Sequence, residues 1–177
     1  MDNISRKWNI VLIFIFVVFF IGFASSQVLK SNKLVEDSKL AFQIETSQDT
    51  VRIGNSILIY MYLKNTANDS IRVKTRMAAN REDEPHDVFF KVHDPSGQQL
   101  SFLVDIQFPS ILSDDDYEIL PPDQWIVKLC QIEHFFDFHQ KGFYKIQAVY
   151  QNWTSPEAGD AWQGSLESNI LEIQIQE

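Results

Sequence analysis

Hydrophobic and polar residues alternate with a period of two from residue 40 to the end of the printed sequence, and no sustained helical pattern interrupts them. In such an alternation successive side chains point to opposite faces, which is typical of β-strands with one buried face. Clusters of Asn, Asp, Pro and Gly separate the alternating runs and indicate turns. The pattern predicts about eight strands at spacings of about 8–14 residues. They cover Leu40–Ile44, Ser56–Leu63, Ile71–Val73, Val88–Val92, Leu100–Val104, Trp125–Leu129, Phe143–Tyr150 and Leu166–Ile175.

Two segments of this pattern carry more specific information. Ser56–Leu63 reads SILIYMYL and is apolar on both faces, so we expect a central strand that is covered on both sides. The segment Asp94-Pro95-Ser96-Gly97 predicts a hairpin turn, because Pro fixes φ and Gly accepts a positive φ. The first segment therefore predicts the centre of a sheet, and the second predicts that the flanking runs pair with each other.

Short strands at regular spacing predict an all-β protein. We expect an antiparallel immunoglobulin-like β-sandwich of about seven to nine strands in residues 40–177. A closed barrel has the same alternation along each strand, so the pattern leaves closure open. The preceding segment, residues 27–39, is polar and irregular, and we expect it to be a tether.

The first 26 residues have a different composition. Ile10–Ala24 is an uncharged apolar run of fifteen residues, with Arg6 and Lys7 before it and Ala24-Ser25-Ser26 at its end. A basic start, a short apolar stretch and small residues predict a signal peptide in residues 1–26 and a secreted or periplasmic domain. The alternative is an uncleaved N-terminal membrane anchor, a single hydrophobic helix with the sandwich outside the cytoplasm. Because a spanning helix needs ~20 apolar residues, the short run favours cleavage.

Composition excludes several classes of protein. The 177 residues carry 15 Lys and Arg against 24 Asp and Glu, a formal net charge of −9, and 45% of them are hydrophobic. The hydrophobic fraction excludes a disordered chain, which cannot bury enough apolar area to offset its conformational entropy. The acid excess argues against nucleic acid as a partner, because phosphates are bound mainly through Lys and Arg. The single Cys excludes an internal disulfide and a zinc site with several Cys ligands.

Catalytic chemistry has no clear sequence signature in this chain. No nucleophile motif surrounds Cys130, which lies in the strand WIVKLCQI on the face opposite Trp125, Val127 and Leu129. We expect Cys130 to be a small buried hydrophobe, with a reactive thiol as the alternative. No catalytic residue is therefore predicted and we expect no enzyme. A carboxylate-based hydrolase stays open as an alternative, because its two acids are brought together only by the fold.

One acidic segment is a candidate cation site. Asp114, Asp115, Asp116 and Glu118 place four carboxylates close together, and oxygen ligands clustered in one loop suit Ca²⁺. Such clusters are also common as solvated loops. Calcium is the one cofactor that the sequence suggests.

Aromatic residues near the last strands predict a recognition surface. Tyr150, Trp153 and Trp162 lie in or beside the connection between the two final runs, among Ser, Pro, Gly and Asp. Exposed Trp and Tyr side chains are frequent anchors for protein partners and platforms for sugar rings. The alternative is that both Trp rings pack back on the edge of the sandwich. The segment Gln107–Glu118 is expected to complete the surface.

The segment after His139 carries the local signal for the fold. Gly142, Tyr144 and Ile146 follow one another at intervals of two, and this spacing resembles the tyrosine corner of the immunoglobulin fold. The resemblance implies that the Tyr144 hydroxyl bonds back to the main chain, that Ile146 stands where antibody domains have their second Cys, and that Trp125 is a core Trp.

Two further resemblances bear on function. The tail from Trp162 through Gly164, Leu166, Ser168 and Asn169 is similar to the last strand of bacterial exported immunoglobulin-like domains. The middle of the chain, with the segments LKNTANDSIRV, HDPSGQQL, ILPPD and KGFYKIQAVY, is similar to a bacterial proteinase-inhibitor family of intracellular type. Together with the aromatic segment, the first resemblance favours a non-enzymatic module that binds a protein or glycan at the cell envelope. Such a module would meet the membrane only through the N-terminal segment, if that segment stays uncleaved. The second implies a proteinase inhibitor, with Gln107–Glu118 as its reactive loop.

Overall fold

The computed structural model describes residues 39–84, 86–104, 113–157 and 159–177. All of them belong to one compact unit, Asp37–Glu177. The predicted signal peptide or anchor in residues 1–26, the tether up to residue 38 and residues 107–112 of the predicted loop lie outside the described residues. Within the described ranges no helix is long and apolar enough to cross a membrane.

The described residues form an all-β unit, as the alternation predicts. Two 3₁₀-helices of three residues each, η1 (Asp114–Asp116) and η2 (Ile132–His134), accompany the strands. The strands outnumber the predicted seven to nine because β2, β5 and β7 are short pairings that leave little periodicity in the sequence. In chain order the strands are β1 (Leu40–Thr46), β2 (Thr50–Arg52), β3 (Leu58–Asn65), β4 (Ile71–Lys74), β5 (Ala79–Asn80), β6 (His86–His93), β7 (Tyr117–Leu120), β8 (Trp125–Gln131), β9 (Gly142–Asn152) and β10 (Gly164–Gln176).

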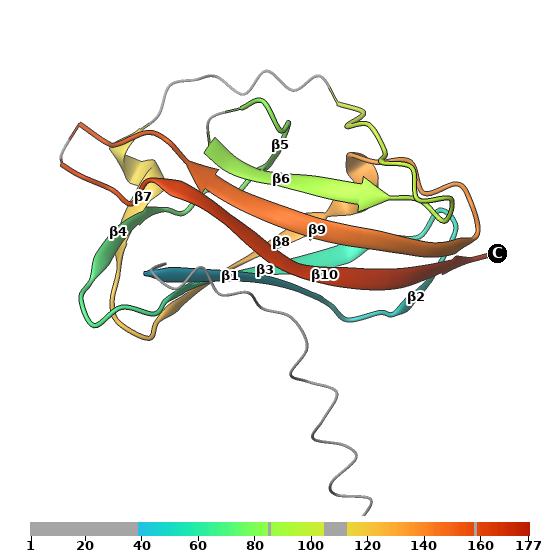
Figure 1. Ribbon diagram of the computed structural model, residues 1–177, viewed down its shortest axis with the longest axis horizontal. Helices are drawn as coiled ribbons and strands as arrows, with labels where there is room; N and C mark the ends of the chain where they lie inside the picture. Colours follow the sequence, from blue (N-terminus) through green and yellow to red (C-terminus); the bar gives the residue numbers. More distant parts are fainter. Residues whose placement is uncertain (1–38, 85, 105–112, 158) are drawn as a thin grey trace, which may run out of the picture. The chain divides into compact units, whose positions relative to one another are not determined.

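Two sheets make the sandwich. One has the order β1-β3-β8, the other has the order β2-β10-β9-β6-β5, and β4 pairs with β7 in a small third sheet. Figure 1 shows β6, β9 and β10 side by side in one layer and β1 and β3 in the other. The long pairs are antiparallel, as predicted, whereas the short strands β2 and β5 pair in parallel.

The core lies between the two sheets. Ile44 of β1 and Ile59 of β3 face Ile146 of β9 and Ile173 of β10, and all four side chains are fully buried. Asn169 of β10 joins the layers at one point: its Oδ1 accepts from the Ile44 N–H at 2.9 Å and its Nδ2 donates to the Ile44 carbonyl at 3.0 Å. A side-chain amide thus connects the β1 and β10 backbones at this point.

Among the described residues, the three-stranded sheet is covered on one face only. β3 lies between β1 and β8, so its predicted central place is confirmed, but its residues alternate between buried and half-buried and the predicted cover on both sides is wrong. On β8, Trp125 is 45% exposed, whereas Cys130 on the opposite face is buried. The predicted core position of Trp125 is therefore also wrong. The period of two places Trp125 and Cys130 on different faces, and the core takes the face of Cys130.

The predicted turn after β6 is present, but its second strand is not. The Asp94 carboxylate accepts from the N–H groups of Ser96 and Gln98 at 2.9 Å, and Gly97 has φ +85°. Only Gln99 pairs back, in an isolated bridge. The predicted strand Leu100–Val104 fails because Phe102 turns to the Phe135 ring, on which it stacks at 5.3 Å.

The tyrosine corner is present. The Tyr144 hydroxyl donates to the Gln140 carbonyl and accepts from the Gln140 N–H, both at 3.1 Å, and Ile146 lies in the core. Gly142 opens β9 at φ +130°, where a Cβ atom would lie 2.8 Å from the Pro95 ring. This position therefore requires Gly.

Candidate functional site

The two segments predicted to form a recognition surface meet at one end of the sandwich. The Asp114 Oδ1 accepts from the Glu157 N–H at 3.0 Å, and the hydroxyls of Tyr117 and Thr154 lie 2.8 Å apart. We call residues 113–118, 152–157 and 159–162 the loop end; Figure 1 shows it beside β4 and β7. Residues about 40 positions apart in the sequence thus form one surface.

Trp153 is the exposed aromatic residue of the loop end. Its side chain is 55% exposed. The neighbouring Asn152 is buried and fixes the backbone, because its Nδ2 donates to the carbonyls of Thr154 at 2.9 Å and Trp162 at 2.7 Å. The Thr154 hydroxyl donates to the Asn152 Oδ1 at 2.8 Å. The Trp153 ring is therefore presented by an ordered loop, the arrangement that limits the entropy lost on binding.

The other two predicted aromatic residues are packed against the sandwich. Tyr150 is completely buried and its hydroxyl donates to the Lys74 carbonyl at 2.9 Å, so the prediction of Tyr150 as a surface binding residue is wrong. Its place on β9 puts the ring on the core face, where burial raises the pKa of the phenol. Trp162 stacks on Tyr150 with ring centroids 5.6 Å apart and an interplanar angle of 22°. A Cβ atom on Gly164 would lie 2.8 Å from the Trp162 ring. The alternative prediction, that both Trp rings pack back on the sandwich edge, thus holds for Trp162 and not for Trp153.

The predicted calcium ligands lie on η1 and β7. Asp114, Asp115 and Asp116 form η1 after the capping residue Ser113, and Glu118 lies exposed on β7. Asp116 and Ser113 form a capping box, and Asp114 binds the backbone of the neighbouring loop. Over the described ranges no group of three or more His, Cys, Asp or Glu is arranged to hold a metal ion. Calcium binding stays a prediction, and the observed contacts of the Asp114 and Asp116 carboxylates order the loop end.

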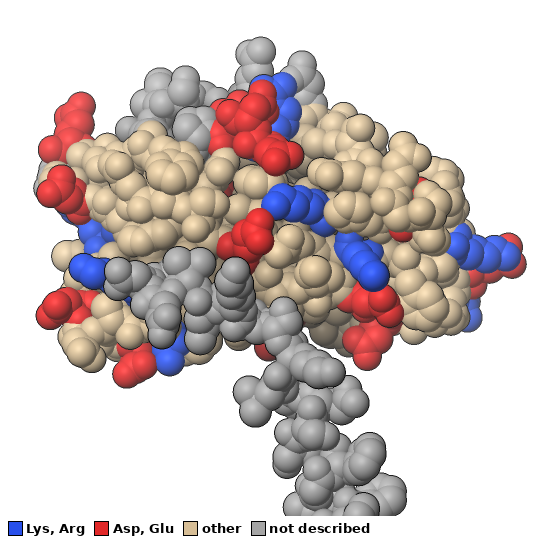
Figure 2. All heavy atoms as spheres, viewed as in Figure 1, with Lys and Arg blue, Asp and Glu red and all other residues tan. Residues whose placement is uncertain are grey.

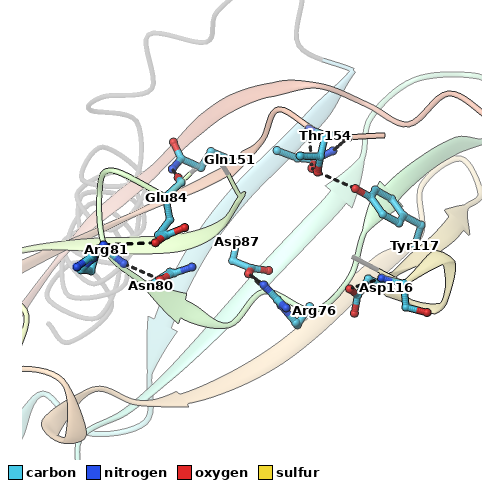
Figure 3. Close-up of polar contacts among 11 residues, drawn as sticks. Arg76, Asn80, Arg81, Glu84, Asp87, Asp116, Tyr117, Gln151 and Thr154 are labelled. Atoms are coloured by element: carbon cyan, nitrogen blue, oxygen red, sulfur yellow. Dashed lines mark hydrogen bonds and ion pairs between the residues drawn. The ribbon is translucent and has the colours of Figure 1, made fainter. Parts of the chain in front are cut away.

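A buried charged cluster of Lys74, Arg76 and Asp87 lies next to Tyr117 of the loop end. Asp87 is completely buried, and the Arg76 Nε donates to its Oδ2 at 2.9 Å (Figure 3). This hydrogen bond raises the pKa of Arg76. Lys74 is also fully buried, with its Nζ 5.6 Å from the centre of the Tyr117 ring. Burial lowers the pKa of Lys74, despite the nearby Asp87.

The sequence did not indicate this cluster. Arg72 and Lys74 alternate with apolar residues, which predicts a half-exposed strand with solvated charges. Burial of Lys74 follows from the position of β7 and of the Tyr150 ring, which are distant in sequence. No local pattern could have shown it.

A pocket with acidic residues in its lining lies toward the other end of the sandwich. This pocket of about 380 Å³ is lined by Arg52, Glu133, Asp137 and His139, among others. The Glu133 Oε2 accepts from the Ile57 N–H at 2.9 Å, and the carboxylate of Asp137 pairs with the His139 Nδ1 at 2.9 Å. Both acids thus have structural partners.

Cys130 is buried on β8, as expected from its place in the strand. Burial raises the pKa of its thiol to about 12, so it is protonated at neutral pH. The reactive form of a Cys is the thiolate, and the buried thiol therefore behaves as a small hydrophobe.

Comparison with known proteins gives structural neighbours only. No protein-family model and no curated protein match the sequence. The CARDB domain of the PF1109 protein from Pyrococcus furiosus, solved in complex with di-metal ions, is 13% identical with a TM-score of 0.38, covering 77% of this chain and 91% of that one. AvmM, described as catalysing macrocyclization in alchivemycin A biosynthesis, is 14% identical with a TM-score of 0.36, covering 78% and 89%. With TM-scores below 0.5, these likenesses carry no argument about this chain.

Proposed function

We propose that this chain is an exported, non-enzymatic immunoglobulin-like module that binds a protein or glycan partner at the cell envelope through its loop end. The observation that carries the proposal is Trp153, a large aromatic side chain that is more than half exposed on a loop fixed by buried hydrogen bonds. Exposed Trp residues on rigid scaffolds are frequent binding anchors. The tyrosine corner at Tyr144 supports the immunoglobulin-like class, and the N-terminal sequence pattern supports export.

The charge around Trp153 indicates the chemistry of the partner. The loop end itself contains exposed acids, among them Asp114, Asp115, Glu118 and Asp160. Acidic side chains protrude from this end of the molecule in Figure 2. An aromatic anchor with an acidic rim is complementary to a partner surface that carries Lys or Arg. Because exposed charges are screened by ions, we expect binding that weakens as the salt concentration rises.

A substitution pair tests the proposal. The protein with Trp153→Ala is compared with wild type and with Phe143→Ala, which removes an aromatic ring of similar exposure from the far end of β9. Each protein is immobilised and exposed to envelope extract from the cells that make it, before and after protease treatment of the extract. We expect wild type and Phe143→Ala to capture the same ligand and Trp153→Ala to lose it, at an unchanged melting temperature.

Protease treatment separates the two partner classes, because it destroys a protein ligand and leaves a glycan. Equal capture by wild type and Trp153→Ala would contradict binding through the loop end. A large fall in the melting temperature of Trp153→Ala would show that the ring is a stabilising contact instead.

A further inference from the structure

The pocket between residues 52–57 and residues 133–139 has the size of a small-molecule site. Its volume of about 380 Å³ lies in the usual range of about 300–1,000 Å³. One wall is the turn that joins β2 to β3, and the other is η2 with the segment that follows it. Figure 1 shows β2 and the last residues of β10 at this end of the sandwich, whereas β4 and β7 lie at the other. We call this cavity the end pocket.

Hydrogen bonds hold the two walls of the end pocket in place. The Asn55 N–H donates to the Arg52 carbonyl at 3.0 Å and closes the turn after β2. The Glu133 Oε2 accepts from the Ile57 N–H at 2.9 Å and so ties one wall to the other. A pocket with ordered walls loses little entropy when it takes up a ligand.

The inner part of the end pocket is apolar. Ile57, Phe136, Phe138 and Ile175 line it, and all four are buried members of the core. The Phe138 ring lies 5.1 Å from the ring of Tyr144, so the tyrosine corner supports this part of the lining. Apolar surface at the bottom of a pocket favours a ligand with an apolar body.

Charged side chains of both signs complete the lining. Arg52 is exposed, and within the described residues its guanidinium has no ion pair and no hydrogen bond. The Glu133 side chain is only 20% exposed, and among the same residues its Oε1 is near the His134 Nε2 alone, at 4.0 Å. The Asp137 Oδ2 pairs with the His139 Nδ1 at 2.9 Å, which leaves its Oδ1 for a ligand. One cationic group and two anionic groups are therefore available at the end pocket.

These opposite charges line one cavity without meeting. In the part of the chain that the structure describes, no ion pair joins Arg52 to Glu133 or to Asp137. A purely cationic ligand would leave Arg52 unpaired beside it, and a purely anionic ligand would face two carboxylates. A molecule with one anionic and one cationic group satisfies both signs through charge-assisted hydrogen bonds. Amino acids with an apolar side chain, and short peptides made of them, combine these two groups with an apolar body.

We infer that the end pocket binds a small zwitterion with an apolar side chain, which is a free amino acid or a dipeptide. The ligand carboxylate meets Arg52, and its ammonium group meets Glu133 and Asp137. Its side chain covers the apolar inner lining at Phe136. The inference does not depend on the loop end as a binding site, because none of the lining residues belongs to residues 113–118, 152–157 or 159–162.

Ligand analogues test the two charged contacts. Isotope-labelled protein, purified from cells that express the full-length sequence, is titrated by NMR with millimolar leucine, leucyl-leucine, leucinamide, which has no carboxylate, and N-acetyl-leucine, which has no ammonium group. We expect leucine or leucyl-leucine to shift the amide signals of Asn55 and Ile57. The two blocked compounds should bind about tenfold or more weakly, because each lacks one charged contact. The tighter of the two zwitterions distinguishes a free amino acid from a dipeptide.

Two substitutions assign the contacts to residues. Arg52→Gln removes the cation, and Glu133→Gln removes a negative charge while keeping an oxygen that accepts from the Ile57 N–H. Arg52→Gln should reduce the preference for the zwitterion over leucinamide, and Glu133→Gln should reduce the preference over N-acetyl-leucine. Glu172→Gln, at an exposed position of β10 outside the end pocket, is the matched control and should change neither preference. Circular dichroism checks that all variants fold.

Three results would overturn the inference. The first is wild-type protein whose spectrum neither zwitterion shifts. The second is a blocked compound that binds as tightly as the zwitterions or more tightly, which would show that the end pocket does not recognise both charges. The third is a set of shifts confined to amides outside the end pocket, which would place the binding site elsewhere.

Discussion

At the scale of single residues, Lys74 has the least usual surroundings. It is fully buried next to the Tyr117 ring, and the nearby Arg76–Asp87 pair already satisfies one charge with another. Removing an ammonium group from water favours its neutral form, which is why the pKa of Lys74 is lowered. The unfolded chain therefore binds this proton more tightly than the folded protein does.

This difference predicts a pH dependence of stability. Between the lowered pKa and the ordinary value of 10.5, the unfolded state holds more protons, so the contribution of Lys74 to the free energy of unfolding rises with pH. Below the lowered pKa the contribution is constant and unfavourable. We expect the free energy of unfolding of wild type, minus that of Lys74→Met, to increase as the pH rises toward 10.5 in urea titrations. Parallel curves for the two proteins would contradict a lowered pKa.

At the scale of elements, the connection between β9 and β10 combines a structural and an exposed Trp. Trp162 stacks on the buried Tyr150 and lies against Gly164, whereas Trp153 points to solvent. Trp162→Ala should lower the free energy of unfolding by about 2–3 kcal/mol, somewhat less than a fully buried Trp would cost. Trp153→Ala should change it by less than about 0.5 kcal/mol. Chemical denaturation of both variants measures the difference, and equal losses would show that the two rings have the same role.

Sequence periodicity predicts individual strands well and their surroundings poorly. The runs that became β1, β3, β9 and β10 are long enough for alternation to show, whereas β2 and β5 have only three and two residues. The face that Trp125 occupies could not be predicted, because alternation separates two faces without saying which one meets the core. Phe102 left its expected strand for a ring contact with Phe135, a residue distant in sequence.

The candidate site was partly predictable for the same reason. Trp153 and the acids of η1 stood out as unusual residues in turn-rich segments, and the structure brings these segments together through the Asp114–Glu157 hydrogen bond. Tyr150 and Trp162 looked similar in the sequence, but their rings are held by β9 and by Gly164. The burial of Lys74 and Asp87 depends on contacts between distant strands, so no local signal marks them.

At the scale of the whole molecule, both sheets of the sandwich contribute residues that hold the segments around the loop end. Asn65 of β3 donates to the Leu120 carbonyl of β7, and Asn152 of β9 donates to the Trp162 carbonyl. A binding residue on such a rigid scaffold loses little entropy when it meets its partner.

The most direct measurement of this account is ligand capture by two matched single variants. Trp153→Ala should lose the ligand that wild type and Phe143→Ala capture from envelope extract, at an unchanged melting temperature. Capture by folded Trp153→Ala at the level of wild type would contradict the account.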